Sequence, residues 1–191
     1  GRNSITGAYP FYRLDTSTIV AQPGKVINYI PKTGYFKDMV PYMISDFESG
    51  LTNSGMAGGN VGMTLVTADS LVYEGAASGG IFMSNAGDSS VDSAITSFPI
   101  PFTAAFIELN YNSTVPFYVG LQAKLGSSVS STPYYLIGLY PSTGWKKLYL
   151  NVSDFNGTYQ GTSYNLYIKA TLPDGQSSGR LLLDNIQLIT F

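Results

Sequence analysis

The sequence predicts an all-β protein, an antiparallel β-sandwich of the jelly-roll type. Short runs rich in Val, Ile, Tyr and Phe alternate with Gly, Pro, Asn and Ser, which is typical of strands separated by turns. No stretch keeps the i, i+3, i+4 and i+7 apolar spacing of an amphipathic helix. The chain has 191 residues, 44% of them hydrophobic, so it can bury the core of one sizeable domain.

Residues 1–43 are predicted to form an N-terminal β appendage, or the tail of a preceding domain. They open with GAYPFYRL and continue with a hairpin-like stretch, residues 16–31, that turns at Pro23 and Gly24. The alternative is that these strands belong to the main sandwich. The jelly-roll domain is predicted to span residues 44–191.

The main domain contains a series of apolar runs with the composition of strands. These predicted strands are residues 102–111, 116–125, 133–140, 145–152, 164–172 and 180–191. Gly- and Ser-rich stretches between such runs are predicted loops, at residues 50–62, 85–93 and 124–131.

Four of these strands show which side chains should face the core, because successive side chains of a strand point to opposite faces. The predicted core residues are Ala105, Ile107, Leu109, Tyr111, Phe117, Val119, Leu121, Ala123, Leu125, Leu148, Leu150, Val152, Tyr164, Leu166, Ile168 and Ala170.

The opposite sides of the same four strands carry aromatic rings and hydrogen-bonding groups. If the strands share a sheet, that face suits a sugar, whose C–H face stacks on a ring while its hydroxyls find donors and acceptors. The predicted stacking residues are Tyr118, Trp145, Tyr149 and Tyr167, with Glu108, Gln122 and Lys147 orienting hydroxyls. The alternative is an ordinary surface, since Tyr packs well on half-exposed strands without any ligand.

Composition excludes several classes of function. A formal net charge of −2 argues against nucleic acid, which requires a basic surface, and no apolar run reaches the length of a membrane-spanning helix. The chain has no cysteine and no histidine, so thiol nucleophiles, disulfides and histidine bases are absent. A composition rich in Tyr, Ser, Thr and Asn without cysteine is typical of extracytoplasmic bacterial proteins.

An enzyme built from this sequence would depend mainly on carboxylates. A glycosidase needs two of them about 5 to 10 Å apart, and the candidates are Glu48, Glu74 and Glu108. Glu108 has no acidic partner evident in the sequence, and the chain lacks the GxSxG turn of a serine hydrolase. We therefore expect no enzymatic activity.

The run RLLLDNIQLITF at residues 180–191 raises a separate question, because it places Asp184 in an apolar strand. A buried carboxylate is costly unless it is paired or hydrogen-bonded. The sequence therefore predicts a partner for Asp184, either a cation or backbone N–H groups.

The order of several motifs resembles carbohydrate-binding-module jelly rolls, a group with a galactose-binding-like fold. These motifs are SDFESG (45–50), VYEGAASGGIFM (72–83), GWKKLYLNVSDF (144–155) and LLLDNIQL (181–188). The opening GRNSITGAYPFYRL and the stretch VAQPGKVINYIPKTGYF resemble the end of an N-terminal β domain in two-domain surface lipoproteins of gut bacteria.

This resemblance implies a calcium ion for part of the group, held at a sheet edge by the residues at motif positions Asp46, Glu48 and Asp184. Carboxylate oxygens are the ligands that calcium prefers. The alternative is that Asp184 accepts backbone hydrogen bonds in a loop or bulge, with no metal.

The resemblance also implies non-catalytic glycan binding in a polysaccharide-capture system, at the outer-membrane surface or in the periplasm. An upstream lipid-anchored cysteine and a protein partner at the cell surface would accompany that role. The rival prediction is a structural or adhesive module that binds no sugar.

Overall fold

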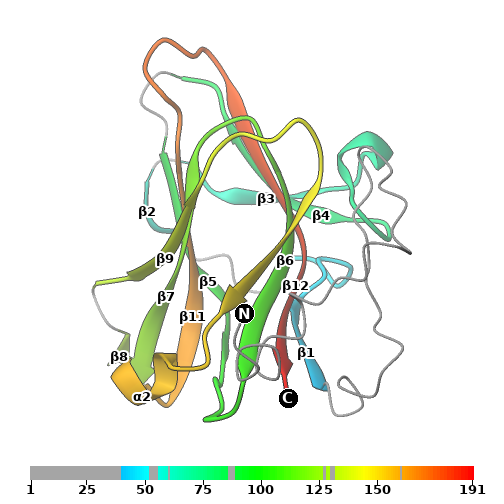
Figure 1. The fold of residues 1–191 in the computed structure, drawn as a ribbon. Helices are drawn as coiled ribbons and strands as arrows, with labels where there is room; N and C mark the ends of the chain where they lie inside the picture. Colours follow the sequence, from blue (N-terminus) through cyan, green and yellow to red (C-terminus); the bar gives the residue numbers. More distant parts are fainter. Residues whose placement is uncertain are drawn as a thin grey trace, which may run out of the picture.

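The computed structural model describes residues 40–51, 56–59, 61–85, 89–126, 128–129, 132–159 and 161–191 of the chain. They form two antiparallel sheets packed face to face, so the predicted all-β sandwich is confirmed (Figure 1). The predicted hairpin at Pro23 and Gly24 lies outside the described residues.

Sheet A has the strand order β10-β6-β12-β4-β3, and β1 also pairs with β12. Its strands are β1 (Val40–Ser45), β3 (Met63–Val66), β4 (Ser78–Met83), β6 (Ala105–Ser113), β10 (Lys146–Asn151) and β12 (Gly179–Thr190). The long strand β12 therefore has β6 along one edge, and β4 and β1 along the other.

Sheet B has the order β2-β5-β11-β7-β8, and β9 also pairs with β7. Its strands are β2 (Met56–Gly59), β5 (Ser89–Phe98), β7 (Phe117–Leu125), β8 (Ser128–Val129), β9 (Tyr134–Leu139) and β11 (Ser163–Thr171). Two short helical turns complete the described part, η3 (Asp69–Leu71) and α2 (Phe155–Tyr159).

One contiguous apolar core fills the space between the sheets, and the predicted alternation is confirmed in all four strands analysed. Ile107 and Leu109 of β6 meet Val119 and Leu121 of β7 in this core. Leu125 is the exception, because it lies at the end of β7 and is 62% exposed.

Three of the strands lie in segments that were predicted to be loops. Strands β2 and β8 and the beginning of β5 carry Gly and Ser where strands usually carry branched or aromatic residues. Hydrogen bonding to neighbouring strands holds these segments in the sheet despite their low strand propensity.

The N-terminal boundary of the jelly roll remains a prediction, since residues 1–39 are not described. Strand β1 begins at Val40 and pairs with β12, so the predicted boundary between residues 43 and 44 falls inside a strand of sheet A.

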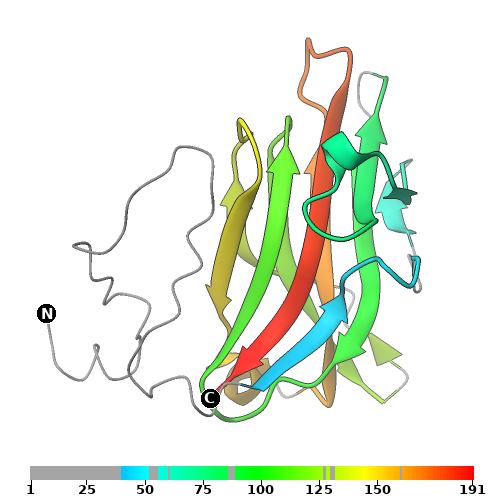
Figure 2. The same ribbon diagram turned by 90° about the vertical axis from the view of Figure 1, so that its right-hand side faces the viewer.

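The two sheets differ in how their outer faces are covered. The segment 67–77, which contains η3, lies in front of β12 on the outside of sheet A (Figure 2). No helix in the described residues has the length and apolar character needed to cross a membrane.

Candidate functional site

The seven predicted glycan contacts do not form one surface. Strands β6 and β10 lie in sheet A, whereas β7 and β11 lie in sheet B. Because the sheets pack face to face, their outward sides point in opposite directions. The expectation of a single platform is therefore wrong, since alternation fixes the face of a strand but not the sheet that it joins.

Sheet B carries Tyr118, Tyr135 and Tyr167 on its outward side, and we call these three residues the tyrosine face. Tyr118 is 49% exposed, Tyr135 is 51% exposed and Tyr167 is buried. The ring centroids of Tyr118 and Tyr135 are 5.5 Å apart, and those of Tyr135 and Tyr167 are 5.7 Å apart. Both pairs meet edge to face, the arrangement that aromatic quadrupoles favour.

Two glycines make room for these rings. Gly120 lies opposite Tyr167 on one side and Tyr135 on the other, so the two tyrosines meet across a position without a side chain. Gly138 lies opposite Tyr118, and a Cβ there would be 2.9 Å from a carbon of the Tyr118 ring.

The buried Tyr167 contacts Tyr135 through its hydroxyl as well as through its ring. Burial, together with a hydrogen bond to Tyr135, raises the pKa of Tyr167 to about 12. The half-exposed ring of Tyr135 therefore packs on a buried neighbour.

Polar side chains lie next to the tyrosine face on the same side of sheet B. Asn165 is opposite Gln122, and Ser97 donates a hydrogen bond to Asn165 Oδ1 at 2.6 Å. Lys124 Nζ donates to Ser97 Oγ at 3.4 Å. Of the predicted contacts, Tyr118, Gln122 and Tyr167 are therefore brought together here.

Tyr135 is the member of this surface that sequence reasoning missed. It lies in the predicted strand 133–140, but the register of β9 shifts where Val119 and Gly120 of β7 pair with it. Leu136 and Ile137 both pack against the core, which breaks simple alternation. The only signal was the tyrosine-rich run itself.

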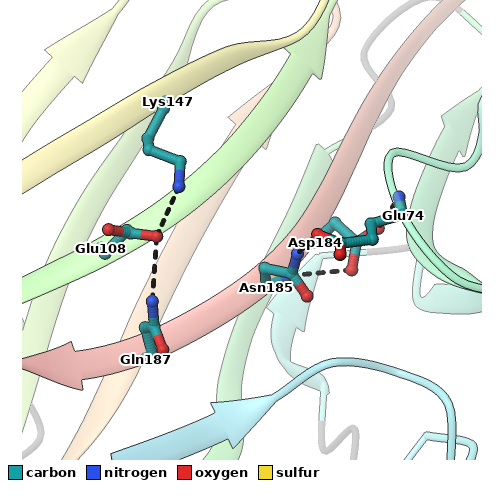
Figure 3. A network of polar contacts seen from close by, with 6 residues as sticks. All are labelled: Glu74, Glu108, Lys147, Asp184, Asn185 and Gln187. Atoms are coloured by element: carbon teal, nitrogen blue, oxygen red, sulfur yellow. Dashed lines mark hydrogen bonds and ion pairs between the residues drawn. The ribbon is translucent and has the colours of Figure 1, made fainter. Parts of the chain in front are cut away.

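On sheet A, the predicted contacts Lys147 and Tyr149 lie around the carboxylate of Glu108. Lys147 Nζ donates to Glu108 Oε1 at 2.7 Å, and Gln187 Nε2 donates to the same oxygen at 2.9 Å (Figure 3). Burial, together with a hydrogen bond to Glu108, raises the pKa of Tyr149 well above its usual range. Glu108 is only 5% exposed, so these groups chiefly bind one another.

Trp145 precedes β10 and is half-buried. The centroid of its ring lies 5.3 Å from that of Tyr73, which comes from the segment 67–77. The indole is therefore partly covered by another aromatic ring in this structure.

The carboxylates of the three glutamates each have partners within the described residues. Glu108 faces Lys147 and Gln187, Glu48 accepts backbone N–H groups, and Glu74 accepts from Asn185 Nδ2 at 2.9 Å. None of the hydrogen bonds and ion pairs of Glu108 in the described residues brings a second acid to it.

Asp184 is fully buried at a bulge of β12 and is held by donors from the segment 73–78 and from its own strand. Ser78 Oγ donates to Asp184 Oδ2 at 2.7 Å, and Glu74 N donates to the same oxygen at 3.3 Å. Asn185 N donates to Oδ1 at 2.8 Å (Figure 3). The alternative without a metal therefore accounts for this carboxylate.

The other two predicted metal ligands also accept hydrogen bonds from the chain. Glu48 Oε1 accepts from Ala76 N at 2.9 Å and from Ala77 N at 3.1 Å, and Asp46 Oδ1 accepts from Glu48 N at 3.1 Å. No group of three metal-ligating side chains occurs within the described residues, so Asp46, Glu48 and Asp184 are not gathered into a calcium site there.

Three of the sequence motifs meet at the segment 73–78, which belongs to the motif VYEGAASGGIFM. Glu48 of SDFESG binds this segment, and so do Asp184 and Asn185 of LLLDNIQL. Their spacing along the chain therefore reflects one hydrogen-bonded junction in the fold.

A separate pocket lies at the end of the sandwich beside α2. It is lined by Asn151, Val152, Asp154, Phe155, Thr158 and Tyr159, none of which was a predicted contact. Val152 and Phe155 are largely buried and belong to the core.

Comparisons with known proteins support the fold. No family model matches the chain, and no curated protein matches it. Among solved structures, a family 11 carbohydrate-binding module from a cellulosomal cellulase of Clostridium thermocellum matches with a TM-score of 0.55 and 18% identity, over 80% of this chain and 95% of that chain. A family 11 module of the same organism, in complex with a β-1,3-1,4-mixed-linked tetrasaccharide, matches with the same score and identity over 78% and 95%. At this identity the likeness shows the fold, a β-sandwich of the kind found in carbohydrate-binding modules.

Proposed function

We propose that the described domain binds glycans without catalysis and that the glycan stacks on the tyrosine face of sheet B. The observation that carries this proposal is the pair of half-exposed rings, Tyr118 and Tyr135, on one face of a carbohydrate-binding-module fold. Fold by itself does not assign function, so the proposal depends on this surface.

The chemistry of the tyrosine face suits a sugar chain. Each ring offers an apolar surface to sugar C–H groups, while Gln122, Asn165 and Lys124 lie nearby to meet hydroxyls. Tyr118 packs against Tyr135, which packs against the buried Tyr167, so these contacts reduce the side-chain freedom lost on binding. Preordered aromatic groups of this kind favour weak but specific binding of oligosaccharides.

The contacts of the three glutamates are consistent with this role. The buried Glu108 is neutralised by Lys147, and the carboxylates of Glu48 and Glu74 are engaged in holding the segment 73–78.

The test is calorimetric titration with mixed-linkage β-glucan tetrasaccharide, preceded by a glycan array to find better ligands. Loss of one stacked ring should weaken binding about 10-fold, since such a contact contributes about 1–2 kcal/mol. Tyr118→Ala and Tyr135→Ala should each show this loss. The matched control is Tyr42→Ala, because Tyr42 has a similar exposure of 44% but lies in β1 of sheet A.

Unchanged affinity in both tyrosine-face variants would refute the assignment of the site. If the folded protein bound no glycan on the array, glycan binding would be refuted and the structural or adhesive alternative favoured.

We further propose an extracytoplasmic location, at the outer-membrane surface or in the periplasm of a bacterium. A chain without cysteine and rich in Tyr, Ser, Thr and Asn supports it, and a polysaccharide binder needs access to its ligand. Digestion of intact cells by added protease should remove a surface-exposed domain. Fractionation distinguishes a periplasmic pool, and a purely cytoplasmic pool would contradict the proposal.

A further inference from the structure

The outer face of sheet A holds a buried amide whose polar atoms have no partner. Asn110 of β6 has 0% exposure, and neither its Nδ2 nor its Oδ1 makes a hydrogen bond in the structure of the described residues. A buried polar group left without a partner costs about 1–3 kcal/mol. Such a group is rare in a folded protein and calls for an explanation.

The residues opposite Asn110 on the two neighbouring strands form hydrogen bonds and an ion pair with other residues. Lys147 is directly opposite on β10, and Asp184 is directly opposite on β12. Lys147 binds Glu108, and Asp184 accepts from Ser78 and Glu74. The amide therefore lies between two engaged charged groups.

The segment 67–77 approaches this position from β12. Glu74 N donates to Asp184 on β12, which is directly opposite Asn110, whereas the ring of Tyr73 packs against Trp145 just before β10. Figure 2 shows the segment in front of β12, on the outside of sheet A. Because β6 lies between β12 and β10, the contact between Tyr73 and Trp145 joins the two sides of β6.

We propose that Asn110 is the polar centre of a second saccharide subsite, closed in this structure by the rings of Tyr73 and Trp145. An amide offers donors and an acceptor in one plane, which matches two adjacent sugar hydroxyls. The amide of Asn110, the ammonium group of Lys147 directly opposite it and the aromatic pair of Tyr73 and Trp145 together supply the kinds of group that a sugar residue needs. This subsite lies on the opposite side of the sandwich from the tyrosine face and is independent of it.

Opening the subsite does not require the segment 67–77 to leave the sheet. Its end is fixed by Glu48 through Ala76 and Ala77, and by Asp184 through Glu74. The contact between Tyr73 and Trp145 is an aromatic pair, which contributes about 0.5–1.5 kcal/mol. A ligand that binds the open form has only this small difference to overcome.

The experiment uses the single tryptophan of the chain as the reporter. Trp145 is the only tryptophan, so its emission reports on sheet A and not on the tyrosine face. The probes are the methyl glycosides of glucose, galactose and mannose, titrated to about 100 mM because single-sugar sites bind in the millimolar range. The protein carries Tyr118→Ala and Tyr135→Ala, which removes the other site.

At least one probe should change Trp145 emission saturably in this background. Tyr73→Ala should tighten that binding several-fold, since one ring of the aromatic pair is gone. Asn110→Leu should abolish the change while leaving the unfolding midpoint the same or higher, because an apolar side chain of similar shape replaces an unpaired amide. Asn110→Ala serves the same purpose if the leucine variant does not fold.

Two results would overturn the subsite. One is the absence of a saturable change for all three probes, both with Tyr73 present and with Tyr73→Ala. The other is binding that persists in the folded Asn110 variant. Neither result affects the tyrosine face, which is tested by calorimetry with Tyr118→Ala and Tyr135→Ala in an otherwise unchanged chain.

Discussion

Gly75 shows how a single residue fixes the junction that holds the segment 73–78 to the sheet. Its φ is +73°, and a Cβ at this position would collide with the carboxylate of Glu48. Glycine therefore suits this position for two reasons: it adopts the backbone conformation without strain, and it leaves the Glu48 carboxylate where that group accepts from Ala76 N and Ala77 N.

We predict that Gly75→Ala destabilises the domain by more than the backbone conformation alone explains. The matched control is Gly175→Ala, because Gly175 has a φ of +82° with no atom within 4 Å of an added Cβ. The control should cost about 1 kcal/mol from left-handed geometry. Gly75→Ala should cost about 1–2 kcal/mol more, because the displaced carboxylate of Glu48 loses its hydrogen bonds to Ala76 N and Ala77 N. Urea denaturation measures both, and equal losses would contradict this role of Glu48.

Asp184 should make stability depend on pH in a defined direction. Burial raises its pKa, partly offset by hydrogen bonds from Ser78, Asn185 and Glu74. A carboxyl whose pKa is higher in the folded than in the unfolded state favours folding below its usual range, near about 4, and loses that contribution as pH rises through the folded value.

We therefore predict that the free energy of unfolding of the wild type, relative to Asp184→Asn, decreases as pH rises from about 3.5 to 6. The asparagine variant has no charge at this position, so the difference isolates Asp184. Urea denaturation at several pH values gives the comparison. A difference that increases with pH would mean that the hydrogen bonds outweigh burial.

The sequence indicated that Asp184 needs a partner, but not which one. Its main donors are Ser78 and the backbone of Glu74, more than a hundred residues earlier in the chain. No local pattern encodes such a contact, because the pairing of β12 with β4 brings these residues together.

Among the elements, β6, β10 and β12 form the part of sheet A where a buried ion pair lies. Lys147 and Glu108 have side-chain exposures of 13% and 7%, and their nitrogen and oxygen are 2.7 Å apart. Loss of one partner would leave a buried charge without compensation.

We predict that Lys147→Met destabilises the domain by about 3 kcal/mol and that adding Glu108→Gln recovers much of this loss. Lys146→Met is the matched control, since Lys146 is the exposed neighbour and should change stability little. Chemical denaturation of the four variants forms a double-mutant cycle. Additive losses for Lys147 and Glu108 would show that the pair is not coupled.

Alternation within strands was predictable, whereas the assembly of strands was not. Ile107, Val119, Leu150 and Ile168 all face the core as expected. The prediction failed at the next level, because β6 and β10 joined one sheet and β7 and β11 the other. Which strands pair depends on contacts between distant residues, and periodicity carries no information about them.

For the whole molecule, the three carboxylates that were predicted to bind calcium already accept hydrogen bonds from the chain. Glu48 and Asp184 already accept hydrogen bonds from backbone groups or Ser78, and Asp46 accepts one from Glu48 N. We predict that EDTA and added calcium leave the melting temperature unchanged. A clear rise with calcium would show that an ion binds after all.

The fold class could be predicted because it depends on composition and on the period of two, both of which are local properties. The division of the outward residues between two separate faces could not be predicted, because it depends on how the strands assemble into the sandwich. Tyr118 and Tyr149 both lie on the outward side of their strands, as expected, but they belong to surfaces on opposite sides of the molecule.

The position of β12 has a consequence for how the domain is made. This strand follows all of its partners in the sequence, yet it pairs with β6, β4 and β1 and so connects most of sheet A. During translation these earlier strands remain unpaired with β12 until residues 179–190 emerge from the ribosome. We expect stalled nascent chains to resist protease only once β12 is outside the exit tunnel, so this domain would acquire its structure in one late step rather than strand by strand.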